Sequence, residues 1–357
     1  MPPYHILVIN PGSTSTKVAV YEDERPLCVS TIRHTPDELA AYAQIIDQHD
    51  FRRQLVTDWL AQNNIPLRFD AIIGRGGLIK PIPGGVYRVN RKMCFETYYA
   101  LRKHACNLGC ILAYELAKEQ GGGCQAYIAD PVTVDELVPE ARVSGSPLMP
   151  RLAIWHALNQ RAIARRYARQ VGCSYNDLNL IVCHLGGGIS VAAHEHGRAI
   201  DANNALDGEG PLSPERAGTL PAADLIHLCY SGRYTEDQLK KRVAGQAGLM
   251  AHLGTTDILQ IMQMIEQGNE RARLLINAMI FHTAKQIAAE GAVLCGRVDA
   301  ILLTGGMAHS AYITEGIKQR VSYLAPVHVF PGEDEMEALA LNALAVLRGE
   351  CQAKEYE

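Results

Sequence analysis

Hydrophobic and polar positions alternate in short runs near the start of the chain. His5 to Val8 is an apolar run rich in β-forming residues, and Lys17 to Tyr21 alternates polar and apolar side chains, as half-buried strands do. Residues 10–16 between them are Asn-Pro-Gly-Ser-Thr-Ser-Thr, residue types that favour tight turns or left-handed backbone. The pattern predicts a hairpin with a polar tip of the size of a phosphate group.

The pattern up to residue 148 goes on to alternate helices with strands. A Ser144-Gly-Ser-Pro147 segment then favours a hinge. The elements predicted before it are a helix over about 37–63, a strand over 69–73 that runs into Gly74-Arg75-Gly76-Gly77, a helix over 96–120, and a strand over 125–129 that ends at Asp130.

The second half of the chain repeats the opening pattern. Leu180 to Leu185 is an apolar strand, Gly186-Gly187-Gly188 follows it, and Ile189 to His194 is a second strand. Aligning His184 with Asn10 superimposes strand, turn and strand at an offset of 184 − 10 = 174 residues. A third strand, Ala300 to Leu303, runs into Thr304-Gly-Gly-Met307. One architecture that occurs twice predicts two related domains.

Helices are expected on both sides of this repeat. Residues 149–171 are predicted to be helical, and residues 335–348 form an Ala/Leu-rich helix. Four arginines on the first of these helices predict a solvated basic face: Arg161, Arg165, Arg166 and Arg169.

Alternating strands and helices define an α/β protein, and 357 residues exceed one ordinary core. We expect a first domain over 1–148 and a second over 149–336. The final helix, about 337–357, is expected to pack back on the first domain.

Composition excludes several classes of protein. Hydrophobic residues make up 48% and charged residues 20% of the chain, with a net charge of −4, which fits a folded globular protein without a concentrated basic surface for nucleic acid. The N-terminus has no secretory pattern, and no run of about 18 apolar residues predicts a membrane span. The ten cysteines are expected to be reduced thiols packed as small hydrophobes in a cytoplasmic protein.

The glycine-rich turns carry the candidate chemistry. Glycine and small hydroxyl residues let several backbone N–H groups point into one concave space, which suits phosphate oxygens. Neither hairpin tip matches a Walker A loop, which needs Gly-x-x-x-x-Gly-Lys-Ser/Thr. A dinucleotide fold is also excluded, because a strand follows Asn10-Pro-Gly where that fold needs a helix.

Four motifs together resemble the acetate kinase family, in its butyrate kinase branch. They are Val8-Ile-Asn-Pro-Gly-Ser-Thr-Ser-Thr-Lys17, Gly74-Arg-Gly-Gly77, His184-Leu-Gly-Gly-Gly-Ile-Ser190 and Glu209-Gly-Pro-Leu-Ser-Pro-Glu-Arg-Ala-Gly218. The resemblance extends from Ile6 to about Ala340. It implies two actin-like (ribonuclease H-like) domains of duplicated βββαβαβα topology with ATP in an interdomain cleft. It also implies a homodimer or higher homo-oligomer.

The resemblance implies a reversible reaction, ATP + butanoate ⇌ ADP + butanoyl phosphate, by direct in-line transfer with Mg²⁺. The implied catalytic residues are Asn10, Arg75, His104, Asp130, His184 and Arg216. The implied nucleotide and phosphate contacts are Gly12, Ser13, Thr14, Lys17, Gly186, Gly187, Gly188, Gly305 and Gly306. Glu335 is the implied metal carboxylate, with Asp334 as the alternative, and Asp201 assists the metal indirectly.

Physical chemistry agrees with these roles. Phosphoryl transfer spreads negative charge over three equatorial oxygens, which planar guanidinium groups stabilise well. Mg²⁺ requires oxygen ligands.

Several alternatives stay open at this stage. Branched-chain (isobutyrate), acetate or propionate specificity is one. Another kinase of the actin-like superfamily is a second, and a non-catalytic ATP-dependent switch is a third.

Overall fold

The chain forms two compact units in a computed structural model that describes residues 2–100 and 104–357. One unit comprises Met1–Val134 and Asp334–Glu357, and the other comprises Asp135–Glu333. The chain therefore leaves the first unit earlier than the expected limit at 148, and the expected hinge at 144–147 lies inside the second unit. The C-terminal segment returns to the first unit.

The first unit is built on a seven-stranded sheet of order β12-β5-β6-β4-β1-β2-β3. β1 pairs with β2 in an antiparallel hairpin and with β4 in parallel, and β4 pairs in parallel with β6. The predicted hairpin and the two following strands are confirmed. The strands are β1 (His5–Pro11), β2 (Ser15–Glu22), β3 (Arg25–Arg33), β4 (Ala71–Arg75), β5 (Val86–Arg88), β6 (Gln125–Ala129) and β12 (Lys354–Glu355).

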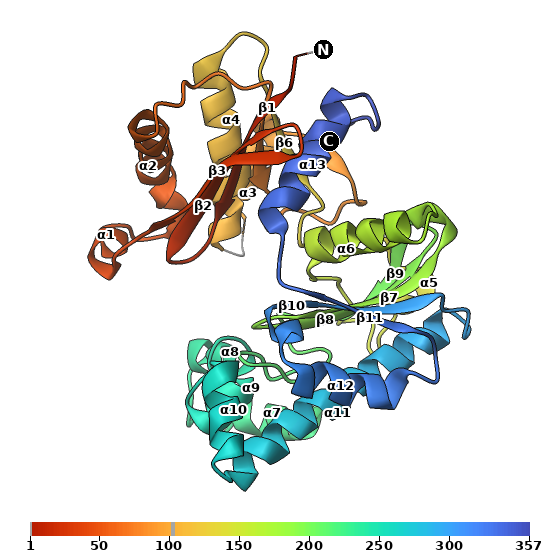
Figure 1. Cartoon of the computed structure of the whole chain (residues 1–357). Helices are drawn as coiled ribbons and strands as arrows, with labels where there is room; N and C mark the ends of the chain where they lie inside the picture. The colour runs from red at the N-terminus through yellow and green to blue at the C-terminus, as the bar shows by residue number, and fades with distance from the viewer. Residues whose placement is uncertain (1, 101–103) are drawn as a thin grey trace. The chain divides into compact units, whose positions relative to one another are not determined.

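Helices cover both faces of this sheet (Figure 1). Leu7 and Ile9 of β1 belong to a core with residues of α2 (His49–Gln62) and α4 (Leu108–Gln120). Successive side chains of a strand point to opposite faces, so the equally buried Ile6 and Val8 face the other side. There α13 (Glu335–Leu347) packs on β1, β4 and β6. Both faces of the sheet are therefore buried at β1, which explains the continuous apolar run of this strand.

The second unit repeats the same strand arrangement in a five-stranded sheet of order β11-β10-β7-β8-β9. β7 and β8 form an antiparallel hairpin, β10 is parallel to β7, and β11 is parallel to β10. These strands correspond in order and direction to β6-β4-β1-β2-β3, as the repeat predicted. The α/β fold class is confirmed. The strands are β7 (Asn179–Leu185), β8 (Ile189–Glu195), β9 (Arg198–Ala202), β10 (Ala300–Gly305) and β11 (Val327–Pro331).

This second sheet is also covered on both faces. Ile181, Cys183 and Leu303 pack with α11 (Glu270–Val293) and α12 (Ala311–Val321). Leu180 and Val182 alternate with them and pack with α6 (Ala157–Gln170). The remaining helices are short: α1 (Pro36–Ala40), α3 (Arg91–Tyr98), α5 (Pro139–Arg142), α7 (Ala222–Cys229), α8 (Glu236–Val243), α9 (Gly248–Leu253) and α10 (Ile258–Glu266), with 3₁₀ turns η1 (Ile45–Gln48), η2 (Ala105–Asn107), η3 (Tyr175–Asp177) and η4 (Gly306–His309).

Three predicted helices are shorter than expected. The helix predicted over 37–63 is divided into α1, η1 and α2, because Gln44 is extended (φ −131°, ψ 151°). Within 96–120, His104 is likewise extended (φ −144°, ψ 152°) before η2 and α4, and residues 101–103 lie outside the described part of the chain. The helix predicted from 149 begins only at Ala157, after the non-helical His156. Extended caps of this kind are not visible in hydrophobic periodicity.

The predicted solvated arginine face is wrong for Arg161. This side chain is buried, and its Nη1 lies 3.0 Å from Glu136 Oε2 and donates to the Gly197 carbonyl at 3.2 Å. The ion pair tolerates burial because both partners are hydrogen-bonded. Arg166 and Arg169 are exposed as expected.

All ten cysteines are free thiols. Cys106, Cys110 and Cys183 are buried, but four others are exposed rather than packed: Cys173, Cys229, Cys295 and Cys351. Among the described residues, no helix combines the length and the apolar character needed to cross a membrane.

Candidate functional site

The tip of the first hairpin is a tight turn over Gly12–Ser15. The Gly12 N–H donates to the Ser15 carbonyl at 2.7 Å, and the His34 N–H donates to the Thr14 carbonyl at 2.9 Å. Ser13 and Thr14 are exposed, as is Lys17 in β2. Within the described part of the chain, the Ser13 and Thr14 N–H groups donate no hydrogen bond. Free N–H groups on a rigid turn can accept an anion.

Beside this tip, Glu335 gathers two of the predicted residues. Its Oε2 accepts from Asn10 Nδ2 at 2.7 Å and from Arg75 Nη1 at 2.5 Å. Asn10 is the last-but-one residue of β1, and Arg75 ends the neighbouring parallel strand β4. Glu335 is the first residue of α13, where the helix dipole favours a carboxylate. Three distant segments thus form one polar cluster.

The two metal candidates differ in their surroundings. Glu335 is 8% exposed, whereas Asp334 is exposed to solvent. The second oxygen of Glu335, Oε1, has no hydrogen-bond partner among the described residues. A buried carboxylate with a free oxygen suits a hard cation such as Mg²⁺, so Glu335 is the better candidate.

Asp130 follows β6 in the strained left-handed region, with φ +40°. Its N–H donates to the Gly85 carbonyl at 3.0 Å, and its Oδ1 accepts from the Gly85 N–H at 2.7 Å. A buried non-glycine residue held at positive φ stores strain, which is typical of functional sites.

His104 lies at the exposed start of η2. Its Nδ1 accepts from the Cys106 N–H at 3.2 Å. An accepting Nδ1 leaves the ring proton on Nε2 in the neutral form.

In the second unit, the tip of the β7–β8 hairpin is the Gly186–Gly188 turn. The loop that follows β9 supports it: Ser213 Oγ and the Glu215 N–H both donate to the Gly187 carbonyl, at 2.6 and 3.1 Å. A methyl group at Gly186 would lie 2.7 Å from His184 Nε2, and one at Gly187 would lie 3.3 Å from the Glu215 carboxylate. Glycine at these two positions avoids the close contacts that a side chain would make with His184 and Glu215.

His184 is the buried last-but-one residue of β7. Its Nδ1 lies 2.8 Å from Asn159 Oδ1 and its Nε2 lies 3.1 Å from Glu333 Oε1. The His156 ring stacks on it at 3.8 Å, and His156 Nδ1 lies 2.7 Å from Ser190 Oγ. Sequence analysis missed His156 and Asn159, although both lie one turn apart at the start of α6.

Arg216 lies beside the same tip. Its Nε is buried without a hydrogen-bond partner in the described part of the chain, and it would lie 3.6 Å from a methyl group at Gly188. The backbone is fixed, because its N–H donates to Ser213 Oγ at 3.1 Å and it bridges to Ala244. An unpaired guanidinium beside a glycine turn is suited to bind a phosphate.

The two glycines after β10 have different roles. Gly305 has φ +93°, and a methyl group there would lie 2.5 Å from the Leu185 carbonyl oxygen, so glycine is required by packing. A methyl group at Gly306 would meet nothing within 4 Å. Of the two, only Gly306 borders open space where a ligand could bind.

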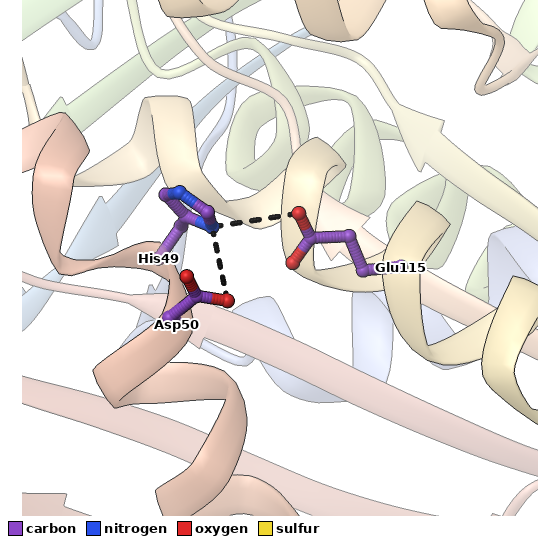
Figure 2. Close-up of side chains that lie close together, drawn as sticks. All are labelled: His49, Asp50 and Glu115. Carbon is purple, nitrogen blue, oxygen red and sulfur yellow. Dashed lines mark ion pairs between the residues drawn. The ribbon is translucent and has the colours of Figure 1, made fainter.

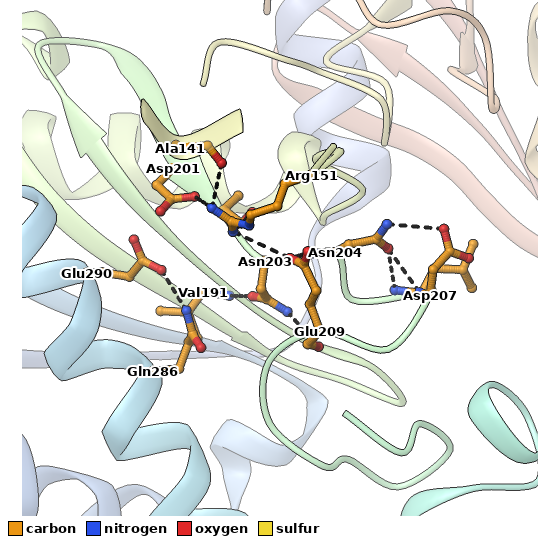
Figure 3. A network of polar contacts seen from close by, with 12 residues as sticks. Ala141, Arg151, Val191, Asp201, Asn203, Asn204, Asp207, Glu209, Gln286 and Glu290 are labelled. Carbon is orange, nitrogen blue, oxygen red and sulfur yellow. Dashed lines mark hydrogen bonds and ion pairs between the residues drawn. The ribbon is translucent and has the colours of Figure 1, made fainter. Parts of the chain in front are cut away.

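The Asp201 side chain is part of a network of hydrogen bonds and ion pairs (Figure 3). Its Oδ1 accepts from Arg151 Nη1 at 3.0 Å, and Arg151 Nη2 lies 3.4 Å from Glu209 Oε2. Glu209 Oε2 also accepts from the Asn204 N–H at 3.0 Å. The network therefore anchors the loop that leads to Arg216.

A further group of possible metal ligands lies on α2 and α4 (Figure 2). The ligand atoms of His49, Asp50 and Glu115 all lie within 4.8 Å of one another. Arg53 supplies cationic partners there, at 3.5 Å from Asp50 and 3.8 Å from Glu115. The arrangement is an ion-pair cluster at a half-exposed helix surface.

The fold of the chain is similar to that of two solved carboxylate kinases. Acetate kinase from Porphyromonas gingivalis superimposes with a TM-score of 0.80 at 17% identity, over 96% of this chain and all of that one. A propionate kinase from Francisella tularensis gives a TM-score of 0.77 at 17% identity, over 95% and 98%. At these identities the likeness is one of fold.

Sequence similarity is closer. A protein from Bacteroides thetaiotaomicron named probable butyrate kinase is 62% identical over 99% of both chains. Butyrate kinase 2 of Clostridium acetobutylicum is 48% identical, again over 99% of both. The model of the acetokinase family matches residues 153–328. The chain belongs to the acetokinase family, which confirms the resemblance drawn from the motifs.

Proposed function

We propose that the chain transfers the γ-phosphoryl group of ATP to a short-chain fatty acid, with butanoate as the preferred acceptor. One observation carries the proposal: relatives named butyrate kinase match 98–99% of this chain at 48–62% identity. The two glycine-rich tips support it, as does Arg216, whose Nε has no hydrogen-bond partner among the described residues.

The reaction needs no strong base. A carboxylate is ionised at neutral pH, and its oxygen attacks the γ-phosphorus while the bond to the β,γ-bridging oxygen breaks and ADP leaves. The transferring group carries negative charge on its equatorial oxygens. Arg216, Arg75 and His184 are assigned to stabilise that charge, and Asn10 donates its amide to a phosphoryl oxygen.

The nucleotide and the acid have separate candidate contacts. We assign the phosphates of ATP to the Gly186–Gly188 turn and the adenosine end to Gly306, which borders open space. Gly305 acts by packing. Asp130 and His104 are assigned to orient the acid and Arg75. The first tip, with Gly12–Thr14 and Lys17, is assigned to the transferred phosphoryl group.

The donor set fits Mg²⁺. Glu335 offers the free Oε1 of a buried carboxylate, and it would hold the ion through oxygen, as Mg²⁺ prefers. When bound, Mg²⁺ neutralises phosphate charge. The pairing of Glu335 with Arg75 holds the carboxylate and the guanidinium in place.

Hydroxylamine trapping of the acyl phosphate tests the reaction directly. The acceptors are acetate, propionate, butyrate, isobutyrate and glycerol with MgATP, and acyl hydroxamate should form fastest with butyrate. A maximum at isobutyrate or at acetate would reassign the acid. One methylene in an apolar pocket is worth only about 1–3 kcal/mol, so neighbouring acids should react more slowly and not be excluded.

Matched variants test the assigned arginine. Arg216→Met should lower kcat by about 10³-fold, within the range of charge-stabilising arginines. Arg233→Met, on an exposed loop of the same unit, should stay within twofold of the wild type. ATP binding without product from any acid would favour a non-catalytic switch, and product from glycerol would favour another kinase of the superfamily.

A further inference from the structure

Arg52 is a completely buried cation directly behind the first hairpin tip. It lies on α2, and its side chain is 0% exposed. Its neighbour Arg53 points away to Glu119, 2.9 Å distant, and is one-third exposed. Two successive arginines on one helix therefore have opposite environments.

The Arg52 guanidinium binds the tip through its carbonyl groups. Nη1 donates to the carbonyls of Gly12 and Ser15 at 2.8 and 3.1 Å, and Nη2 donates to the Ser13 carbonyl at 3.3 Å. Nε and Nη2 also donate to Gln48 Oε1 at 3.1 and 2.8 Å. Three carbonyls of one turn thus point inward. The exposed Ser13 and Thr14 N–H groups stay free of partners in the described part of the chain.

The charge of Arg52 has no counter-ion among the described residues. All its acceptors are neutral: three carbonyls, the Gln48 amide and Thr16 Oγ1 at 3.1 Å. Burial lowers the pKa of Arg52 to about 10. The nearby His34 contributes no negative charge, and burial followed by the charge of Arg52 lowers its own pKa to about 4. Thr16 Oγ1 lies 2.9 Å from His34 Nε2, so a neutral chain runs from the arginine to that ring.

An uncompensated buried cation costs several kcal/mol. Hydrogen bonding alone could be supplied by a neutral amide at lower cost, so the positive charge calls for a further explanation. An anion held at the outer side of the tip would provide compensation, with only one turn of backbone between it and the guanidinium.

We propose that Arg52 is a positioning residue that fixes the first hairpin tip and supplies a buried counter-charge for the phosphoryl group bound there. The inference rests on the proposed function, because it takes the γ-phosphoryl group of ATP as the anion. Arg52 touches only protein atoms and acts through the turn.

The ATP–ADP difference in binding tests this role without turnover. Calorimetric titration would compare ADP with a non-hydrolysable ATP analogue, both with Mg²⁺. Arg52→Met should weaken binding of the analogue by about tenfold and leave ADP within about twofold, because only the analogue carries a γ-phosphoryl group. Arg53→Met, the matched control, should change neither. A merely structural role would weaken both nucleotides alike or neither, and either result would overturn the proposal.

A second variant keeps the test valid if Arg52→Met fails to fold. Arg52→Lys retains a charge, and burial lowers the pKa of a lysine. Preferential binding of the analogue should therefore survive at pH 6 and disappear towards pH 9, as the lysine loses its proton. The wild type should keep its preference over this range. Parallel pH profiles of Arg52→Lys and the wild type would overturn the counter-charge.

Failure of the proposed function would look different. A wild type that forms no acyl phosphate but distinguishes the analogue from ADP through Arg52 would remove the carboxylate kinase reaction and keep the counter-charge. A wild type that forms acyl phosphate, with Arg52→Met binding both nucleotides normally, would keep the reaction and remove the counter-charge.

Discussion

Glu290 makes the stability of the second unit depend on pH. It lies on α11 and is 1% exposed. Its Oε1 accepts from Gln286 Nε2 at 2.8 Å, and its Oε2 is buried without a hydrogen-bond partner in the described part of the chain. Figure 3 shows this carboxyl on α11 together with Asp201 and Arg151. Burial, and then the negative charge of Asp201, raise the pKa of Glu290 to about 8.

The sign of the effect follows from the direction of this shift. The ordinary pKa of the group is 4.5, so between pH 4.5 and 8 folded Glu290 keeps a proton that the unfolded chain has lost. The free energy of unfolding therefore falls as pH rises through this window. With about 1.4 kcal/mol for each pKa unit, the loss between pH 5 and pH 8 is roughly 3–4 kcal/mol.

Urea unfolding of the wild type and Glu290→Gln at pH 5, 6, 7 and 8 measures the effect. Glutamine keeps the shape and cannot ionise, so the variant should gain stability relative to the wild type by roughly 3–4 kcal/mol from pH 5 to pH 8. Glu266→Gln, at an exposed position of α10, serves as the control and should follow the wild type. If the stabilities of wild type and Glu290→Gln change in parallel, Glu290 does not titrate in this window and the reasoning is refuted.

Three further substitutions test the glycine turns and the metal carboxylate. Gly305→Ala should destabilise the fold by about 3 kcal/mol or more. Its methyl group would lie 2.5 Å from the Leu185 carbonyl oxygen, and φ at this position is +93°. Thermal unfolding measures the loss of stability. Gly187→Ala should cost about 1 kcal/mol of stability or less, because its methyl group would lie 3.3 Å from the flexible Glu215 carboxylate, which has to shift slightly. It should raise KM for MgATP about tenfold, because it places a methyl group at the exposed residue of the tip. An unchanged KM in initial rates with varied MgATP would show that the tip binds no phosphate. Glu335→Gln should lower kcat by about 10²-fold and raise the Mg²⁺ concentration needed for half-maximal rate, and an unaltered Mg²⁺ dependence would exclude Glu335 as the ligand.

Local sequence was sufficient to locate the two hairpins. Residues 10–16 and Gly186–Gly188 contain the residue types that tight turns require, and apolar runs flank both. The same strand arrangement therefore emerged twice, in agreement with the 174-residue offset between Asn10 and His184. The helical segment of residues 222–293, which holds α7 to α11, is longer than the segment between β3 and β4, which holds α1, η1 and α2.

Burial of charged side chains could not be predicted from the same patterns. Arg52 and Arg53 are adjacent in one helix, and hydrophobic periodicity gives no reason to treat them differently. Arg52 is buried because the turn carbonyls of a distant hairpin supply its acceptors. Glu335 differs from Asp334 for a similar reason, since Glu335 is buried against Asn10 and Arg75, whereas Asp334 is exposed. Such partners are set by tertiary structure, at separations of up to 325 residues along the chain.

The two hairpin tips solve the same structural problem with different groups. A turn that offers N–H groups to an anion must direct its carbonyls elsewhere, and those carbonyls need donors when they are buried. In the first unit the donor is the Arg52 side chain. In the second unit Ser213 Oγ and the Glu215 N–H bind the Gly187 carbonyl.

This difference explains why the arginine beside each tip lies in a different position. The loop that supports the triglycine turn also carries Arg216, so its guanidinium can reach a ligand directly. Its Nε has no hydrogen-bond partner in the part of the chain that the structure describes. The first tip exposes hydroxyl side chains of Ser13 and Thr14 to solvent, and its cation lies behind the backbone. Loss of Arg216 should therefore remove a group that contacts the ligand directly and lower the rate of catalysis. Loss of Arg52 should act through the turn. Its effect should be smaller, because peptide groups separate its charge from the ligand.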